Sequence, residues 1–172
     1  ILPYSNPQIC PTGADVRHFV PEMLLAADAV KAGMDLVRPL LADSGIEPIG
    51  KVVLGTVKGD LHDIGKNIVG MMLEGAGFEV IDVGVNVNPE RFVDAALEHD
   101  AGIVALSALL TTSMAAMGGA VTALHKARDT RGLGARILVG GPPVNSDFAA
   151  SIGADGYGSD APDAVRIARG LI

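Results

Sequence analysis

Short apolar runs alternate with longer amphipathic segments from about residue 50 to the end of the chain. The short runs are rich in valine and isoleucine and predict strands. These strands are expected at 51–57, 78–83, 102–106, 136–139 and 155–157. Between them, apolar residues recur at steps of three and four, which predicts helices. The helices are expected near 65–75, 89–99, 113–129 and 144–152, with a last one from about Pro162.

Strands that alternate with helices of this length form a parallel sheet with right-handed crossovers. Five such units predict an α/β domain of the flavodoxin-like (Rossmann-like) type, a doubly wound five-stranded parallel sheet. In this architecture ligands bind outside the carboxyl ends of the strands, where the strand order switches. We therefore expect the loops after the first, third and fourth strands to meet at one rim.

The beginning of the chain follows another pattern. Residues 1–13 contain three prolines and little periodicity, which indicates an irregular lead-in. From Val20 to about Ala42 the apolar residues again recur at steps of three and four, which predicts a helix. A polar break at 43–48 follows. We expect two parts: residues 1–47, and a flavodoxin-like domain at 48–172.

Composition limits the classes of partner. Hydrophobic residues make up 49% of the chain and charged residues 19%, as expected of a sheet covered by helices on both faces. The net charge of −7 argues against a nucleic-acid partner, because phosphate binding needs clustered Lys and Arg. No apolar run approaches the roughly 20 residues that span a bilayer, and no secretory signal pattern is visible. A cytoplasmic protein without a membrane partner is expected.

The loop after the first predicted strand carries the clearest chemistry. It reads Gly-Asp-Leu-His-Asp-Ile-Gly-Lys-Asn over 59–67. A histidine that binds a metal through one ring nitrogen usually gives its other N–H to a carboxylate, and Asp60 is suitably placed to receive it from His62. A hydroxyl from another loop could bond the same carboxylate, and Ser113 is the candidate. The sequence thus suggests a relay of three side chains.

One histidine cannot hold a bare metal ion. Mononuclear zinc sites need three or four protein ligands, and the other histidines, His18, His99 and His125, lie in unrelated segments. The single cysteine, Cys10, has no second thiol to pair with. A lone histidine makes sense if the metal arrives already chelated in a macrocycle.

Two later loops suit a large organic cofactor. Residues 105–113 pass from an apolar strand into hydroxyl side chains, and the fourth strand ends on Gly140 and Gly141. Glycines at such a point let a ligand approach the backbone closely. These loops could form the walls of a slot.

The stretch 56–69 resembles, without interruption, the cobalamin-binding motif of corrinoid proteins from methyltransferase systems. The similarity extends over about residues 16–170 and includes the cobalamin module of methionine synthase. It implies that His62 replaces the cofactor's own dimethylbenzimidazole as the lower cobalt ligand, while the nucleotide tail threads into the domain. It also implies that Asp60 and Ser113 are the relay partners of His62 in the working cycle.

The same resemblance implies a wider set of residues in contact with cobalamin. In the first loop these are Asp60, Leu61, His62, Asp63, Ile64 and Gly65, and after the third strand they are Ser107, Leu109 and Thr111. Near the later strands they are Gly140, Gly141, Tyr157, Gly158 and Ala161. Residues 19–27 resemble the later part of the family's helical cap, which places Val20 and Met23 near the methyl group on the upper cobalt face.

The function that this resemblance implies is methyl carriage. The protein would take a methyl group from a methyl-donor:corrinoid methyltransferase and deliver it to a second methyltransferase directed to a folate, a pterin or a thiol. The cofactor would be cobalamin with its cobalt, as methylcobalamin during the cycle, and a corrinoid-reactivating protein is a further candidate partner. The chain would be the non-catalytic, methyl-carrying component of the system.

Three other functions stay open for the sequence alone: the cobalamin domain of an adenosylcobalamin-dependent isomerase, a cobalamin-dependent sensor, and a flavin-binding protein. The form of residues 58–67, K-G-D-x-H-D-I-G-K-N, favours methyl transfer over isomerisation. The sequence shows no DNA-binding segment, which counts against a sensor. A flavin site should offer phosphate-binding hydroxyls in the first loop, where this chain offers Asp-x-His.

Overall fold

The computed structural model describes residues 47–172 and, before them, Leu25, Ala29, Ala32, Gly33 and Leu36, all five of which are helical. The chain divides into two compact units, Ile1–Gly45 and Ile46–Ile172. Val20, Met23 and most of the helix predicted from 20 to 42 lie outside the described residues. The account that follows concerns the second unit.

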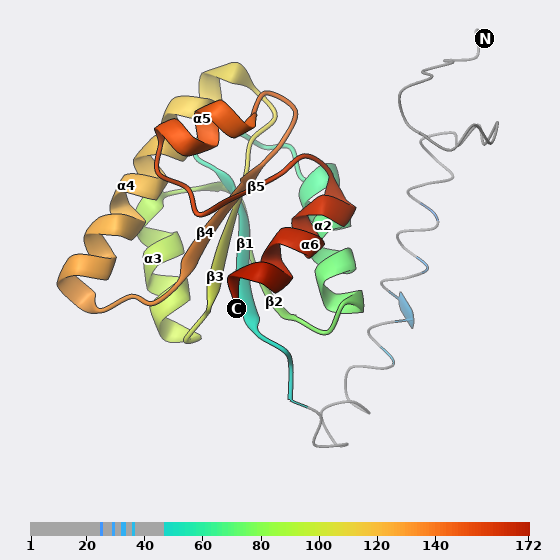
Figure 1. Ribbon diagram of the computed structural model, residues 1–172. Helices are drawn as coiled ribbons and strands as arrows, with labels where there is room; N and C mark the ends of the chain where they lie inside the picture. Colours follow the sequence, from blue (N-terminus) through green and yellow to red (C-terminus); the bar gives the residue numbers. More distant parts are fainter. Residues whose placement is uncertain (1–24, 26–28, 30–31, 34–35, 37–46) are drawn as a thin grey trace, which may run out of the picture. The chain divides into compact units, whose positions relative to one another are not determined.

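The second unit is built on a five-stranded parallel sheet in the order β2-β1-β3-β4-β5. The strands are β1 Lys51–Val57, β2 Glu79–Val87, β3 Ile103–Ser107, β4 Arg136–Gly140 and β5 Gly156–Gly158. This is the flavodoxin-like order, so the predicted fold class is confirmed. The order reverses between β1 and β3, which are hydrogen-bonded neighbours, so the loops that follow these two strands lie side by side (Figure 1).

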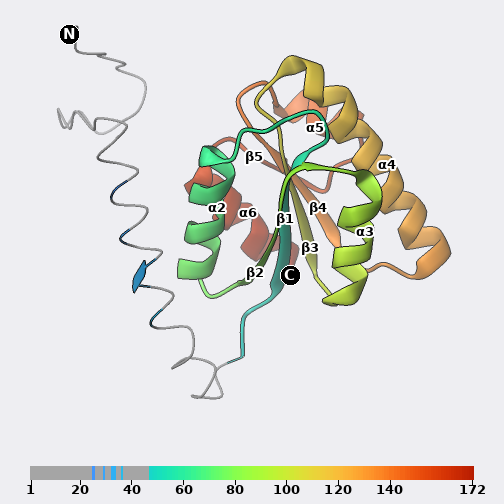
Figure 2. The same ribbon diagram turned by 180° about the vertical axis from the view of Figure 1, so that it is seen from behind.

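Helices cover both faces of the sheet. They are α2 Ile64–Gly75, α3 Pro89–Glu98, α4 Met114–Arg131, α5 Ser146–Ser151 and α6 Ala161–Leu171, with a short 3₁₀ turn, η1, at Thr111–Ser113. Helices α2 and α6 pack on one face, and α3, α4 and α5 lie on the other, as the two opposite views show (Figures 1 and 2). The domain therefore has two apolar cores, one on each side of the sheet.

Strand β1 shows how the sequence produces this arrangement. All of its residues after Lys51 are buried. Successive side chains of a strand point to opposite faces, so Val53 and Val57 enter the core beneath α3 and α4 while Val52 and Leu54 enter the core beneath α2 and α6. A strand buried on both faces reads as a continuous apolar run, as β1 does.

Strand β2 is longer than predicted, because it continues past residue 83 to Val87. Its second half contains Gly84 and Asn86, both with positive φ, and its pairing with β1 shifts register twice near Gly55. Such bulges are typical of edge strands, which also tolerate polar residues because only one side is paired. The polar pattern after residue 83 therefore marks an irregular edge and not the end of the strand. The other bounds agree with the prediction to within a few residues.

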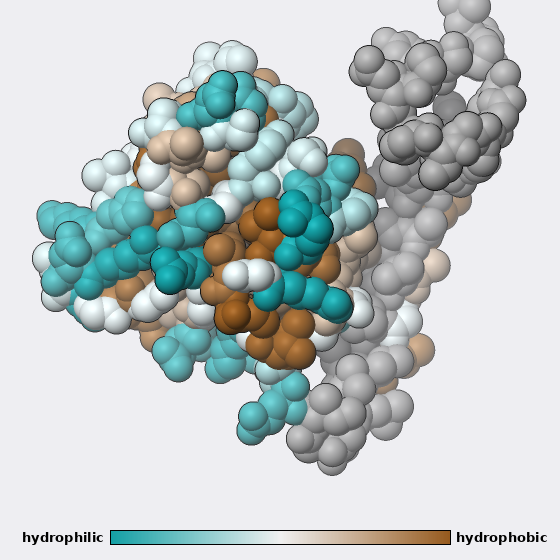
Figure 3. Space-filling view, viewed as in Figure 1, coloured by the Kyte–Doolittle hydropathy of each residue, from teal (hydrophilic) through white to brown (hydrophobic). Residues whose placement is uncertain are grey.

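Apolar side chains gather on the surface over α6 and its carboxyl end, surrounded by hydrophilic ones (Figure 3). The exposed large hydrophobic residues of the domain include Ile49 and Ile172. Among the helices of the described residues, none is both long enough and apolar enough to cross a membrane.

Candidate functional site

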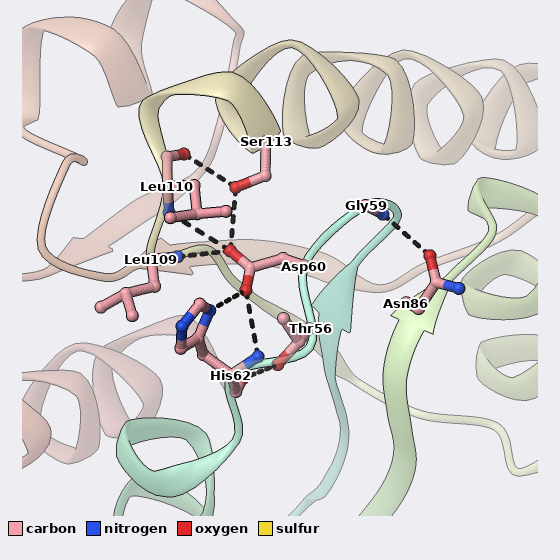
Figure 4. Close-up of polar contacts among 8 residues, drawn as sticks. All are labelled: Thr56, Gly59, Asp60, His62, Asn86, Leu109, Leu110 and Ser113. Carbon is pink, nitrogen blue, oxygen red and sulfur yellow. Dashed lines mark hydrogen bonds and ion pairs between the residues drawn. The ribbon is translucent and has the colours of Figure 1, made fainter.

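Asp60 lies at the centre of the rim formed by the carboxyl ends of the strands and is 0% exposed. Its Oδ1 accepts a hydrogen bond from the backbone N–H of His62 (3.1 Å) and lies 2.7 Å from Nδ1 of the same residue. Its Oδ2 accepts from the N–H groups of Leu109 (2.7 Å) and Leu110 (3.3 Å) and lies 2.9 Å from Oγ of Ser113 (Figure 4). One carboxylate thus joins the loop after β1 to the loop after β3.

These contacts decide the charge of Asp60. Burial raises its pKa, but the hydrogen bonds from Leu109, from the backbone and ring of His62 and from Ser113 outweigh burial and hold the pKa well below its usual range. Asp60 is therefore ionised at neutral pH. A buried carboxylate is normally tolerated only when hydrogen bonds compensate its lost hydration, and here both of its oxygens have donors.

The ionised carboxylate also fixes the tautomer of His62. An ionised carboxylate can only accept, so Nδ1 of the neutral ring carries the proton and Nε2 keeps its lone pair. The His62 side chain is 52% exposed. Within residues 47–172 no group is found to bond Nε2, so this nitrogen is available to an electron-pair acceptor.

Ser113 ends the 3₁₀ turn before α4 and is buried. Its Oγ lies 2.9 Å from Asp60 Oδ2 and 2.7 Å from the carbonyl oxygen of Leu110. A hydroxyl has one hydrogen, so it donates to only one of these acceptors at a time. The structure thus brings His62, Asp60 and Ser113 into one chain of contacts, as the sequence suggested.

A cavity of about 260 Å³ lies beside His62, between the start of α2 and the ends of β3, β4 and β5. It is lined by His62, Gly65, Lys66, Ser107, Ala108, Leu109, Gly141, Pro142, Gly158, Ser159, Asp160 and Ala161. Two of its glycines mark close approaches of the chain. A Cβ on Gly141, whose φ is +121°, would lie 1.9 Å from the carbonyl oxygen of Ala108, and one on Gly158 would lie 2.9 Å from Cα of Ala164.

Seven of the residues expected to contact a cofactor line this cavity, and the others that the structure describes lie in or beside the same loops and strand ends. Leu61, Asp63, Ile64 and Thr111 are exposed on the neighbouring loops. Gly140 lies against the backbone of Gly158. Tyr157 packs against the core on the α3 and α4 side of the sheet. Neighbouring residues of a strand point to opposite faces, and the next residue, Gly158, faces Ala164 of α6 on the other side.

Five lining residues were not singled out individually as cofactor contacts: Lys66, Ala108, Pro142, Ser159 and Asp160. Lys66 belongs to the motif of the first loop but was not singled out. It is buried, and its Nζ donates to Oδ1 of Asn67 (2.7 Å) and pairs with the carboxylate of Asp82 on β2. Asp160 also caps α6, where its Oδ1 accepts from the N–H of Asp163 (2.8 Å).

Thr56 is another residue with a role that the sequence did not predict. It is the one hydroxyl residue of β1 and is completely buried, and its Oγ1 donates to the carbonyl oxygen of His62 (2.9 Å). A polar residue inside an otherwise apolar strand was the available signal. Its contact anchors the backbone of His62 to the sheet.

The described residues contain no group of three or more His, Cys, Asp or Glu side chains that could hold a metal ion. A metal at His62 would therefore need most of its ligands from elsewhere.

Residues 50–166 match the family described as the B12 binding domain. The chain is 43% identical over 159 residues to a corrinoid protein of Desulfitobacterium hafniense (strain Y51), covering 90% of this chain and 72% of that protein. It is 40% identical over 157 residues to dimethylamine corrinoid protein 1 of Methanosarcina acetivorans, again covering 90% and 72%.

A solved structure shows the same architecture. The fold superimposes on a chain of the methanol:cobalamin methyltransferase complex MtaBC from Methanosarcina barkeri with a TM-score of 0.70 and 32% identity. The match covers 90% of this chain and 58% of that one.

Proposed function

This chain belongs to the cobalamin-binding corrinoid proteins of methyltransferase systems, and from that premise we propose that it carries a methyl group on cobalamin with His62 as the protein's ligand to cobalt. The observation that supports the proposal is the contact between His62 and Asp60. A half-exposed imidazole has Nδ1 2.7 Å from a buried, ionised carboxylate, which leaves Nε2 free for a metal. Metal-binding histidines commonly have such a carboxylate partner.

The surroundings of His62 fit a corrinoid. Exposed leucine and isoleucine side chains flank the ring and offer an apolar surface to a macrocycle: Leu61 (72% exposed), Ile64 (52%), Leu109 (40%) and Leu110 (41%). Three glycines line the cavity beside the ring, and at Gly141 and Gly158 the chain passes so close to Ala108 and Ala164 that no side chain would fit. We assign this cavity to the nucleotide tail with its dimethylbenzimidazole. When bound, the corrinoid supplies the methyl-accepting and methyl-donating chemistry at its cobalt.

Asp60 and Ser113 control the imidazole. The Asp60 carboxylate holds Nδ1–H, which orients the ring and makes Nε2 a better electron donor. An imidazole released from the metal would take up a proton at Nε2, and the same Asp60 carboxylate would pair with the resulting imidazolium. The hydrogen bonds from Ser113 and from the N–H of Leu109 lower the pKa of Asp60 and so favour its ionised form. The relay would couple release of His62 to uptake of one proton.

The methyl donor belongs to the same proposal. One relative is named a dimethylamine corrinoid protein, and another related chain comes from a methanol:cobalamin methyltransferase complex. We therefore propose a methylated amine or methanol as the donor, each activated by its own methyltransferase. A second methyltransferase would pass the methyl group to a folate, pterin or thiol acceptor, and a reactivating protein would restore the reduced cofactor.

The test is methyl uptake by the reconstituted protein. We expect protein loaded with hydroxocobalamin and reduced to gain the absorption spectrum of a methylated corrinoid only when a methylamine- or methanol-directed methyltransferase and its substrate are both added. His62→Ala should slow this uptake by about tenfold or more, because it removes a metal ligand. His99→Ala is the matched control and should behave as the wild type, because His99 follows α3 beside Lys51, the first residue of β1.

Two results would reject methyl carriage. One is a fully reduced protein that no such partner methylates. The other is turnover that occurs only with an adenosyl upper ligand, which would indicate an isomerase domain instead.

A further inference from the structure

We propose that Asn86 is a positioning residue for the His62–Asp60 pair, because it ties the edge strand β2 to the loop that carries both residues. Asn86 is exposed and does not line the cavity beside His62. The inference rests on the proposed function only in taking His62 as the cobalt ligand. The contacts that support it belong to the protein alone.

Asn86 makes two hydrogen bonds to consecutive residues of the loop. Its side-chain Oδ1 accepts from the backbone N–H of Gly59 (2.8 Å) (Figure 4). Its backbone N–H donates to the carbonyl oxygen of Asp60 (2.9 Å). A third bond, from the N–H of Asp60 to the carbonyl oxygen of Val57 (3.2 Å), closes the turn. Together they fix the backbone on both sides of the Asp60 Cα atom, and so the direction in which its side chain leaves the chain.

The backbone conformations of Gly59 and Asn86 suit this contact. Gly59 has φ +82° and Asn86 has φ +54°, in the left-handed region, which asparagine enters more easily than most other non-glycine residues. The second register shift of β2 against β1 lies between Gly84 and Val87, so it includes Asn86 and leaves this residue without a partner in the regular ladder. The irregular edge of β2 is thus what brings its amide to Gly59.

The segment from Gly59 to His62 is held at both ends. Asn86 holds its start, and Thr56 Oγ1 holds the carbonyl oxygen of His62 (2.9 Å) at its end. Between these anchors the Asp60 carboxylate reaches the loop after β3. Loss of the first anchor would let the turn relax, so that the carboxylate and the imidazole no longer share one fixed geometry.

Two substitutions separate the amide from the backbone conformation. Asn86→Gly keeps a residue that adopts positive φ freely but removes the acceptor of Gly59. Asn86→Asp keeps an acceptor oxygen at the same place and should therefore behave as the wild type. Asn88→Gly is the matched control, because Asn88 is exposed, lies two residues away and makes no side-chain cap bond to α3.

The first readout uses the cofactor-free protein. In Asn86→Gly the Gly59 amide should exchange its hydrogen about fivefold faster, as expected for loss of one ordinary hydrogen bond. The nitrogen chemical shifts of the His62 ring should move toward those of a free histidine. Both quantities should stay at the wild-type values in Asn86→Asp and Asn88→Gly.

The second readout uses the corrinoid-loaded protein. Asn86→Gly should bind hydroxocobalamin about tenfold more weakly, an effect typical of removing a residue that orients a metal ligand. The nitrogen splitting of its cobalt(II) electron paramagnetic resonance spectrum should be reduced or heterogeneous. Asn86→Asp should restore both.

The outcomes distinguish this inference from the proposed function. If Asn86→Gly frees the Gly59 amide but keeps the wild-type His62 shifts, affinity and splitting, Asn86 only supports the turn, and the inference is overturned. If the wild-type protein itself shows no histidine splitting, the proposed function fails. The His62 shifts of the cofactor-free protein then still decide whether Asn86 positions the pair.

Discussion

Asp60→Ala should lower the free energy of unfolding of the cofactor-free protein by about 3 kcal/mol or more, because several buried donors lose their acceptor at once. The carboxylate receives the N–H groups of His62 and Leu109 and contacts the hydroxyl of Ser113, and it is completely buried. Without it these donors face an apolar methyl group. Urea unfolding followed by circular dichroism measures the effect.

Asp60→Asn is the matched variant for this prediction. It keeps the shape and one acceptor oxygen, but its amide nitrogen must face a donor on the side of either His62 or Leu109. It should therefore lose less stability than Asp60→Ala. An alanine variant within about 1 kcal/mol of the wild type would show that water replaces the carboxylate without cost, which the described burial does not allow.

Lowering the pH should remove the contribution of ionised Asp60 to the free energy of unfolding. The pKa of Asp60 is lower in the folded protein than in the unfolded chain. As the pH falls, the unfolded state therefore binds more protons than the folded state. The stabilisation by Asp60 is present above about pH 4 and is lost below it. The stability difference between wild type and Asp60→Asn should shrink in that range. Asp155 and Asp163 also have lowered pKa values, but they contribute equally to both proteins. A difference that is constant down to pH 2 would contradict the assignment.

Gly141→Ala should be about as damaging as Asp60→Ala, for a steric reason. The added Cβ would lie 1.9 Å from the carbonyl oxygen of Ala108, and the φ of +121° is unfavourable for any side chain. The backbone strain and the forced shift of the loop after β3 should together cost about 3 kcal/mol or more. Thermal unfolding measures the loss, and the surviving folded protein should bind hydroxocobalamin poorly because the cavity wall has moved.

Gly119→Ala is a control that should change the stability in the opposite direction. Gly119 lies in α4 with nothing near its missing Cβ, so alanine should stabilise the protein by about 0.5–1 kcal/mol. If Gly141→Ala unfolded at the wild-type temperature, the close contact described between the loops after β3 and β4 would be contradicted.

The sequence was sufficient for the fold because its two periodicities are clear. Strand β1 was predicted to the residue, since its apolar run is broken only by Thr56 and lies between two lysines, Lys51 and Lys58. Strand β2 was not, because the positive φ values of Gly84 and Asn86 depend on pairing at the edge of the sheet, which no local pattern reveals.

The candidate site, like the fold, could be predicted from the sequence only in part. His62, Asp60 and Ser113 could be placed together because the ends of neighbouring parallel strands converge on one rim. Thr56, Lys66 and Asn86 could not be given their roles, since each acts through a partner that only the folded chain brings near. Lys66 reads as a surface lysine in a helix until Asp82 of β2 is seen beside it.

The central claim is that a protein imidazole, that of His62, binds the cobalt. The most direct test is the electron paramagnetic resonance spectrum of the cobalt(II) form, recorded with protein whose histidines alone carry nitrogen-15. Nitrogen-14 splits each cobalt line into three and nitrogen-15 into two. The account predicts twofold splitting in the labelled wild type and in His99→Ala, and its loss in His62→Ala. Threefold splitting that persists in the labelled protein would mean that the cofactor's own base binds the cobalt, and would contradict the account.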